Sequence, residues 1–372
     1  MKDFVLLVSI LFFYFSSFAS GEGMEPNSST IRPMSFCPLT TKNINSIFND
    51  RKVLKVLSID GGGVSGIIPA RILAEFEKRS GKPVSKLFDL VVGNSTGGLI
   101  SLLLTTPNES QQSRYKAIDI VNLYRYRSWE IFQSSIFRKI YTGFGLWEPK
   151  YNRDIYDKLL GEYLGDTRMS QLLMPTGIIT YNLNSGLPTI WSRDDARKNP
   201  YKDLFIKDIA AATTAAPTYF APKVLVDGNN KIEYHIDGAV YENNPASASI
   251  LMAFELDSSL TRQDIILLSL GTVDNQLTAN TGSLSTAGLF GWLITGRLID
   301  VMVNAVGYWE TMAITFPNSC RIQLPLKRDM LQLDNASNEN LESLLKVADD
   351  YINDNSGFID HIVNILTFSQ KI

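Results

Sequence analysis

The stretch that decides the fold runs from position 88 to 98 and reads Phe-Asp-Leu-Val-Val-Gly-Asn-Ser-Thr-Gly-Gly. Its first five residues form a short apolar run typical of a buried strand, and residues 99–104 begin a helix-like run behind it. Between the two lies a Gly-x-Ser-x-Gly element, in which glycines flank Ser95 and permit a tight strand-to-helix turn. Such a turn exposes one hydroxyl as a nucleophile and predicts a hydrolase. The alternative is a glycine-rich turn with an incidental serine.

A second glycine-rich turn precedes the first one in the chain. The β-rich run 53–59 ends at Asp60-Gly61-Gly62-Gly63, and residues 67–80 then show helical spacing. A strand–glycine–helix order that occurs twice in succession predicts parallel strands with right-handed crossovers. Further strand-like or helical runs cover 177–183, 209–216, 232–236, 245–256, 265–270, 321–324 and 337–352. We therefore predict an α/β fold in three layers, α/β/α, with a mainly parallel central sheet in a single domain.

The N-terminal segment has the composition of a targeting sequence. Residues 1–20 combine Lys2 with the apolar run 5–18, which is too short to span a bilayer comfortably, and small residues follow at the cleavage position. This pattern is typical of a secretory signal peptide, with an uncleaved anchor as the alternative. Residues 21–50 are polar and contain prolines, so we interpret them as an irregular N-terminal arm. We expect a protein of the secretory pathway, either secreted or vacuolar.

The composition disfavours several classes of function. The net charge of −3 gives no sign of nucleic-acid binding, and a basic membrane-binding tail is absent. Two histidines and two cysteines, with no C-x-x-C pair, argue against a zinc site. We expect neither a metal nor a cofactor. Cys37 and Cys320 can form one bridge in an oxidising compartment, but their spacing does not demand it.

Residues 284–309 are unusually apolar, and their apolar side chains fall mostly on one side of a predicted helix. Arg297 and Asp300 interrupt the run, so a transmembrane span is not expected. The favoured interpretation is a helix packed on the sheet. The alternative is an interfacial or lid segment that meets lipid.

The segment from Asp60 to Gly66 contains G-x-G-x-x-G after a strand, a pattern that also occurs in dinucleotide-binding folds. The Asp60 carboxylate would repel a pyrophosphate, and no acidic residue ends the next strand. A smaller anion suits the loop better, because consecutive glycines let backbone N–H groups point inward and stabilise a tetrahedral oxyanion. We therefore predict that Gly61, Gly62 and Gly63 form an oxyanion hole, with nucleotide binding as the weaker alternative.

The general base must come from elsewhere in the chain, which has only two histidines, His235 and His361. His361 lies in an apolar stretch near the C-terminus and is interpreted as structural. His235 and Asp237 point to the same face of one strand-like run, and Asp237 stands at the strand end, where catalytic groups of open α/β sheets lie. We predict a Ser95–Asp237 dyad, with a triad through His235 as the alternative. An aspartate that only caps the next helix is the structural alternative.

In this order and spacing, the three motifs resemble the patatin-like phospholipases. That family pairs a D-G-G-G-x-[RK]-G loop with a G-x-S-x-G elbow and a D-G-[GA] aspartate, which here read 60–66, 93–97 and 237–239. Residues 211–222 and Asn243-Asn244-Pro245 add similarity, and the resemblance covers roughly 53–330. With its leader, the chain resembles plant-storage-type patatins most. We expect a catalytic domain over 51–330 and C-terminal helices packed on it over 331–372.

The resemblance implies a calcium-independent lipid acyl hydrolase of the phospholipase A type. Such an enzyme cleaves carboxylic esters of phospholipids or galactolipids at a membrane or micelle surface, through a Ser–Asp dyad and an acyl-enzyme. A storage or lipid-binding protein with little turnover is one alternative, and an acyltransferase is another. Ser65 stands where the family usually has a basic residue, which leaves the head-group preference open.

Overall fold

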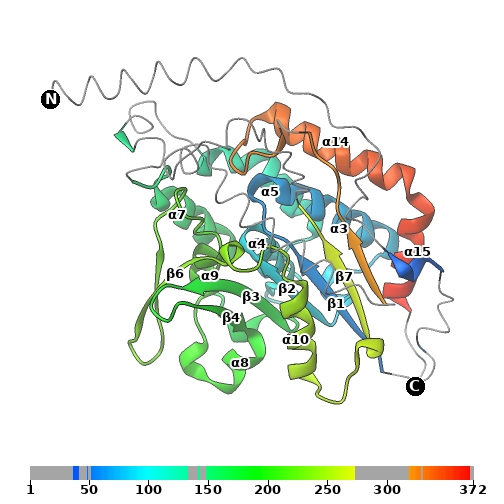
Figure 1. Cartoon of the computed structure of the whole chain (residues 1–372), viewed down its shortest axis with the longest axis horizontal. Coiled ribbons are helices and arrows are strands. Elements are labelled where there is room, and N and C mark those ends of the chain that lie inside the picture. The colour runs from blue at the N-terminus through cyan, green and yellow to red at the C-terminus, as the bar shows by residue number, and fades with distance from the viewer. Residues whose placement is uncertain are drawn as a thin grey trace, which may run out of the picture.

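The computed structural model describes residues 37–41, 48, 52–132, 141–142, 148–272, 318–327 and 330–368. These residues form an eight-stranded sheet with helices on both faces (Figure 1). The predicted signal peptide, most of the predicted arm and the apolar segment 284–309 lie outside the described residues. Within the described part, no helix is long and apolar enough to cross a membrane.

The sheet runs in the order β5-β6-β3-β2-β1-β7-β8, and β4 pairs with β3 off this path. Four strand pairs are parallel: β1–β2, β1–β7, β2–β3 and β7–β8. Three pairs are antiparallel: β3–β4, β3–β6 and β5–β6. The predicted mainly parallel sheet is thus confirmed. The strands are β1 (Leu54–Ile59), β2 (Leu90–Asn94), β3 (Thr176–Asn182), β4 (Leu187–Ser192), β5 (Lys223–Val226), β6 (Ile232–Asp237), β7 (Ile265–Leu270) and β8 (Ser319–Ile322).

Two apolar clusters place the helices in layers. The larger cluster joins one face of the sheet to α3, α4, α5, α14 and α15, and the smaller one joins the other face to α10. Because side chains alternate along each strand, neighbouring strand residues enter different clusters, which gives the three-layer arrangement. The helices are α3 (Ile67–Ser80), α4 (Ser95–Thr105), α5 (Ala117–Ile131), α7 (Arg153–Leu164), α8 (Arg193–Lys198), α9 (Ile206–Thr213), α10 (Ala246–Leu256), α14 (Asn338–Asp354) and α15 (Ser356–Thr367).

Strand β3 positions the site because two strands share one of its edges. β4 pairs with 177–182 along one edge, so β2 and β6 both lie on the other. β2 runs parallel to β3 and ends with Asn94 opposite Ile179. β6 runs antiparallel and ends with Asp237 opposite Thr180. Because Ile179 and Thr180 are consecutive, the carboxyl ends of β2 and β6 meet.

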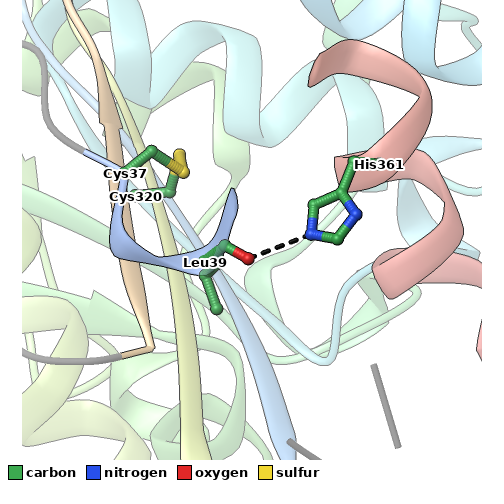
Figure 2. Close-up of a disulfide and its surroundings, with 4 residues drawn as sticks. All are labelled: Cys37, Leu39, Cys320 and His361. Carbon is green, nitrogen blue, oxygen red and sulfur yellow. Dashed lines mark hydrogen bonds between the residues drawn. A yellow bond between two sulfur atoms is a disulfide. The ribbon is translucent and has the colours of Figure 1, made fainter. Parts of the chain in front are cut away.

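A disulfide between Cys37 and Cys320 ties the N-terminal part of the described chain to β8 (Figure 2). The bridge that the sequence left open is therefore present. The short helical turn that follows Cys37 lies against α15, where the Nε2–H of His361 donates to the carbonyl of Leu39 at 3.0 Å (Figure 2). His361 thus makes a structural contact between two distant parts of the chain.

We expect replacement of both cysteines by serine to lower the free energy of unfolding. A bond that joins residues 283 positions apart restricts the unfolded chain, and native disulfides of this kind contribute about 2–4 kcal/mol. Urea unfolding of the double variant should show a lower midpoint than the oxidised wild type. Wild type treated with a reductant should match the double variant. Equal midpoints for the oxidised and reduced wild type would contradict a stabilising role.

Candidate active site

Ser95 lies at the corner between β2 and α4, with a φ of 50°, in the left-handed region. The flanking glycines make this corner possible. A Cβ on Gly97 would lie 2.1 Å from the carbonyl oxygen of Ile59, and a Cβ on Gly93 would lie 2.3 Å from that of Gly97. The Ser95 N–H donates to Thr213 Oγ1 at 2.8 Å. The strained turn holds the side chain at a helix N-terminus, where negative charge is favoured.

The Ser95 side chain faces Asp237. Ser95 Oγ donates to Asp237 Oδ2 at 2.6 Å, and the N–H of Ala239 donates to Oδ1 at 2.9 Å. The Asp237 residue is only 3% exposed. Burial raises the pKa of Asp237 to about 7, against the opposing effect of the hydrogen bonds from Ser95 and Ala239. A carboxylate with this pKa is a competent general base near neutral pH.

A capping role accounts for only one of the two oxygens of the Asp237 carboxylate. Its Oδ1 caps the short 3₁₀ turn Gly238–Val240. It does not cap α10, whose first amides donate instead to the side chains of Asn244 and Glu242. The other carboxylate oxygen faces Ser95 and has no capping role.

His235 lies two residues before Asp237 on β6 and is fully buried. Its Nδ1 is 2.9 Å from Thr180 Oγ1, and its ring centroid is 5.5 Å from that of Trp191. Within the described residues, His235 has no hydrogen bond to Asp237 or Ser95. Burial lowers the pKa of His235, which favours the neutral ring. The geometry therefore supports a dyad and gives no support to the triad.

The glycine loop after β1 is held from two directions. Asp60 and Arg321 of β8 are both buried and form a bidentate ion pair, with Nη1 donating to Oδ1 at 3.0 Å. The N–H of Val64 donates to the carbonyl of Leu333 at 2.9 Å. Gly63 has a φ of 58°, and a Cβ there would lie 2.1 Å from that same carbonyl oxygen. Only glycine fits this approach.

The three predicted oxyanion donors differ in their hydrogen bonding. The N–H of Gly61 already donates to the carbonyl of Asn243 at 3.2 Å. The N–H groups of Gly62 and Gly63 donate to no protein atom in the described part of the chain. Both glycines line the same pocket as Ser95. Two of the three amides are therefore available to an oxyanion.

An apolar pocket of about 150 Å³ adjoins the Ser95 hydroxyl. The glycine loop, Asp237, Asn243 and a few hydroxyl side chains supply its polar groups, and its remaining wall is mostly apolar and aromatic. Such a combination can bury a hydrocarbon chain while a few polar groups orient its reactive end. The apolar wall includes Leu99, Leu123, Ile131, Phe132, Tyr156, Tyr219 and Phe220. Among the described residues, no group of three His, Cys, Asp or Glu side chains could hold a metal ion.

Two supporting residues were not predicted as members of the site, although Thr213 lies in the stretch 211–222 that resembles the family. Thr213 links the elbow to β3, since its Oγ1 accepts from the Ser95 N–H and donates to the carbonyl of Ile179 at 2.6 Å. Arg321 fixes Asp60, as described above. The signal that could have found it is an arginine at the start of the strand-like run 321–324, because a guanidinium buried in a strand requires an acidic partner.

Comparison with known proteins identifies relatives of this chain. The family model described as patatin-like phospholipase matches residues 57–250. Patatin-2-Kuras 3 of Solanum tuberosum is 32% identical over 329 residues, which cover 80% of this chain and 83% of that protein. Patatin-like protein 2 of Oryza sativa subsp. indica is 30% identical over 348 residues, which cover 83% and 86%. A third relative, named Probable inactive patatin-3-Kuras 1, of Solanum tuberosum, is 33% identical over 262 residues, which cover 65% and 68%.

Proposed function

This chain belongs to the patatin-like phospholipase family, and on that premise we propose that it hydrolyses phospholipids or galactolipids through Ser95 and Asp237. Members of the family are serine-type lipid acyl hydrolases, so the chain is an enzyme that acts on carboxylic esters. The observation that carries the proposal is the 2.6 Å hydrogen bond from Ser95 Oγ to the buried Asp237 carboxylate. This pair lies beside an apolar pocket that suits an acyl chain.

The proposed reaction proceeds in two acyl-transfer steps. Ser95 Oγ attacks the ester carbonyl carbon while Asp237 Oδ2 accepts the hydroxyl proton. The negative charge that develops on the carbonyl oxygen is stabilised by the N–H groups of Gly62 and Gly63 and by the N-terminus of α4. The ester bond then breaks, and the alcohol leaves with the proton from Asp237. Water attacks the acyl-enzyme with Asp237 again as base, and Asp237 returns that proton to Ser95 Oγ as the acyl–oxygen bond breaks and the fatty acid is released.

A storage or lipid-binding role with little turnover is the second candidate, because one relative bears the name Probable inactive patatin-3-Kuras 1. A fluorophosphonate probe separates the two. If the chain is a hydrolase, one equivalent of probe should bind per chain, at Ser95. Hydrolysis of micellar phosphatidylcholine and galactolipid should then fall in proportion to the fraction of chains labelled. A chain that binds these lipids without reacting with the probe would be a lipid-binding protein. Added glycerol should appear in the products only if the acyl-enzyme also transfers to alcohols.

We also propose that the protein matures in the secretory pathway. The predicted leader supports this, and the Cys37–Cys320 bond suits an oxidising compartment. N-terminal sequencing of the mature protein would test the expected cleavage near position 20.

A further inference from the structure

The side chain of Asn243 borders the same small space as the Ser95 side chain. A Cβ placed on Gly61 would lie 2.7 Å from Asn243 Oδ1 and 3.0 Å from Ser95 Cβ. Asn243 Oδ1 and Ser95 Cβ therefore lie less than about 6 Å apart by the sum of these distances. Asn243, Ser95 and the glycine loop all line the pocket.

The terminal amide of Asn243 is free to donate. It makes no hydrogen bond within the described chain, and the residue is partly exposed to the pocket. Rotation about its last side-chain bond can therefore turn Nδ2 into the pocket without breaking a contact. The next residue differs, because Asn244 is buried and its Oδ1 accepts the N–H of Ala246 at 3.2 Å.

The backbone around Asn243 is fixed to both halves of the site. Its carbonyl accepts the N–H of Gly61, and the carbonyl of Glu242 accepts Asn94 Nδ2 at 2.6 Å, directly before the nucleophile. The backbone of Asn243 is thus held beside the glycine loop and the elbow, while its side-chain amide remains able to rotate. This anchoring removes the Gly61 N–H from the oxyanion hole, which leaves room for another donor.

We propose that Asn243 is a catalytic residue whose Nδ2–H donates to the oxyanion of the tetrahedral intermediate, alongside the N–H groups of Gly62 and Gly63. A donor in this role must lie about 2.7–3.1 Å from the oxyanion, which forms in the space that Asn243 and Ser95 both face. This inference rests on the proposed hydrolase function.

The test compares Asn243→Ala with Asn243→Asp on micellar phosphatidylcholine, at an alkaline pH where Asp237 is fully ionised. Loss of one oxyanion donor typically lowers kcat by about 10²–10³-fold. We expect a loss of this order for Asn243→Ala, with KM and the melting temperature close to those of wild type. Asn243→Asp should be slower still, because a carboxylate of the same shape repels the oxyanion. Asn244→Ala, as a matched control, should lower the melting temperature and keep kcat within about threefold of wild type.

The Asp variant distinguishes hydrogen-bond donation from a role in shape. If Asn243 only filled space, the isosteric Asn243→Asp would retain more activity than Asn243→Ala, and that order would overturn the proposal. Retention of more than a third of the wild-type kcat by Asn243→Ala would also overturn it. Wild type and Ser95→Ala are measured in the same series. Equal rates for those two would refute the hydrolase function itself, whereas a fast wild type with unaffected Asn243 variants would refute only the role of Asn243.

Discussion

Ser95→Ala is expected to hydrolyse micellar phosphatidylcholine at less than about one ten-thousandth of the wild-type rate, because removal of a serine nucleophile removes the covalent route. The Ser95 hydroxyl is the group that donates to Asp237 and borders the apolar pocket. Alanine retains the backbone corner and deletes only the attacking oxygen. Release of fatty acid from the micelles, followed at pH 8, measures the loss.

The matched control for this variant is Ser101→Ala. Ser101 lies on the same helix, is also buried, and donates its hydroxyl to the carbonyl of Gly97 at 2.7 Å. It does not line the pocket. Its removal should leave the rate within a few-fold of wild type. If Ser95→Ala kept a tenth of the wild-type rate, another group would have to be the nucleophile.

Asp237→Asn is expected to reduce kcat by about 10²–10⁴-fold, the contribution that a positioned general base typically makes. Asparagine keeps the size of the side chain and can still accept the Ala239 N–H, but its amide cannot take the serine proton. In wild type, the active form is the carboxylate. With the pKa of Asp237 raised by burial to about 7, kcat/KM should fall about tenfold for each pH unit below 7.

The same substitution should stabilise the fold at alkaline pH. Because the pKa of Asp237 is higher in the folded chain than its ordinary value of 3.8, the folded state holds this proton between about pH 4 and 7 while the unfolded state releases it. The free energy of unfolding of the wild type therefore falls as the pH rises through this window, by about 1.4 kcal/mol for each pH unit. Urea midpoints of Asp237→Asn should exceed those of wild type at pH 8 and match them near pH 4.

The control for both Asp237 measurements is Asp166→Asn. Asp166 has an 82% exposed side chain and pairs with Lys207 at the surface. This variant should keep the wild-type activity and the wild-type dependence of stability on pH. A wild-type activity profile that stays flat from pH 5 to 9 would contradict the role of Asp237 as base.

Elements with strong local signals were predicted with the bounds that the structure shows. The helix 67–80 ends where Gly81 adopts a left-handed φ of 68°, and the strand 265–270 is a continuous apolar run buried between parallel neighbours. Strands β4 and β5 were not predicted. β4 contains Pro188 and β5 has only four residues, so neither produces a long periodic pattern.

The sequence motifs identify Ser95 and Asp237 separately, but local patterns do not predict that the two residues lie next to each other. The sequence predicts parallel strands, whereas β6 runs antiparallel both to β3 and to β5, with which it forms a hairpin. The hairpin turn depends on Asp227, whose Oδ1 accepts the N–H groups of Asn229 and Lys231. The Cys37–Cys320 bond and the Asp60–Arg321 pair likewise join segments more than 250 positions apart, beyond the reach of local patterns.

The shared edge of β3 makes the distance between nucleophile and base independent of the chain that connects them. Ser95 and Asp237 are 142 positions apart, yet each follows or ends a strand paired with one of two consecutive β3 residues. Insertions in the intervening surface loops should leave the two groups in place. A slip of β6 by a single residue would instead turn the carboxylate to the opposite face of the sheet. Two strand ends and the middle of β3 therefore constitute a minimal scaffold. A protein engineer who grafts this chemistry elsewhere must first preserve the pairing register of these three strands, and only then the surrounding helices.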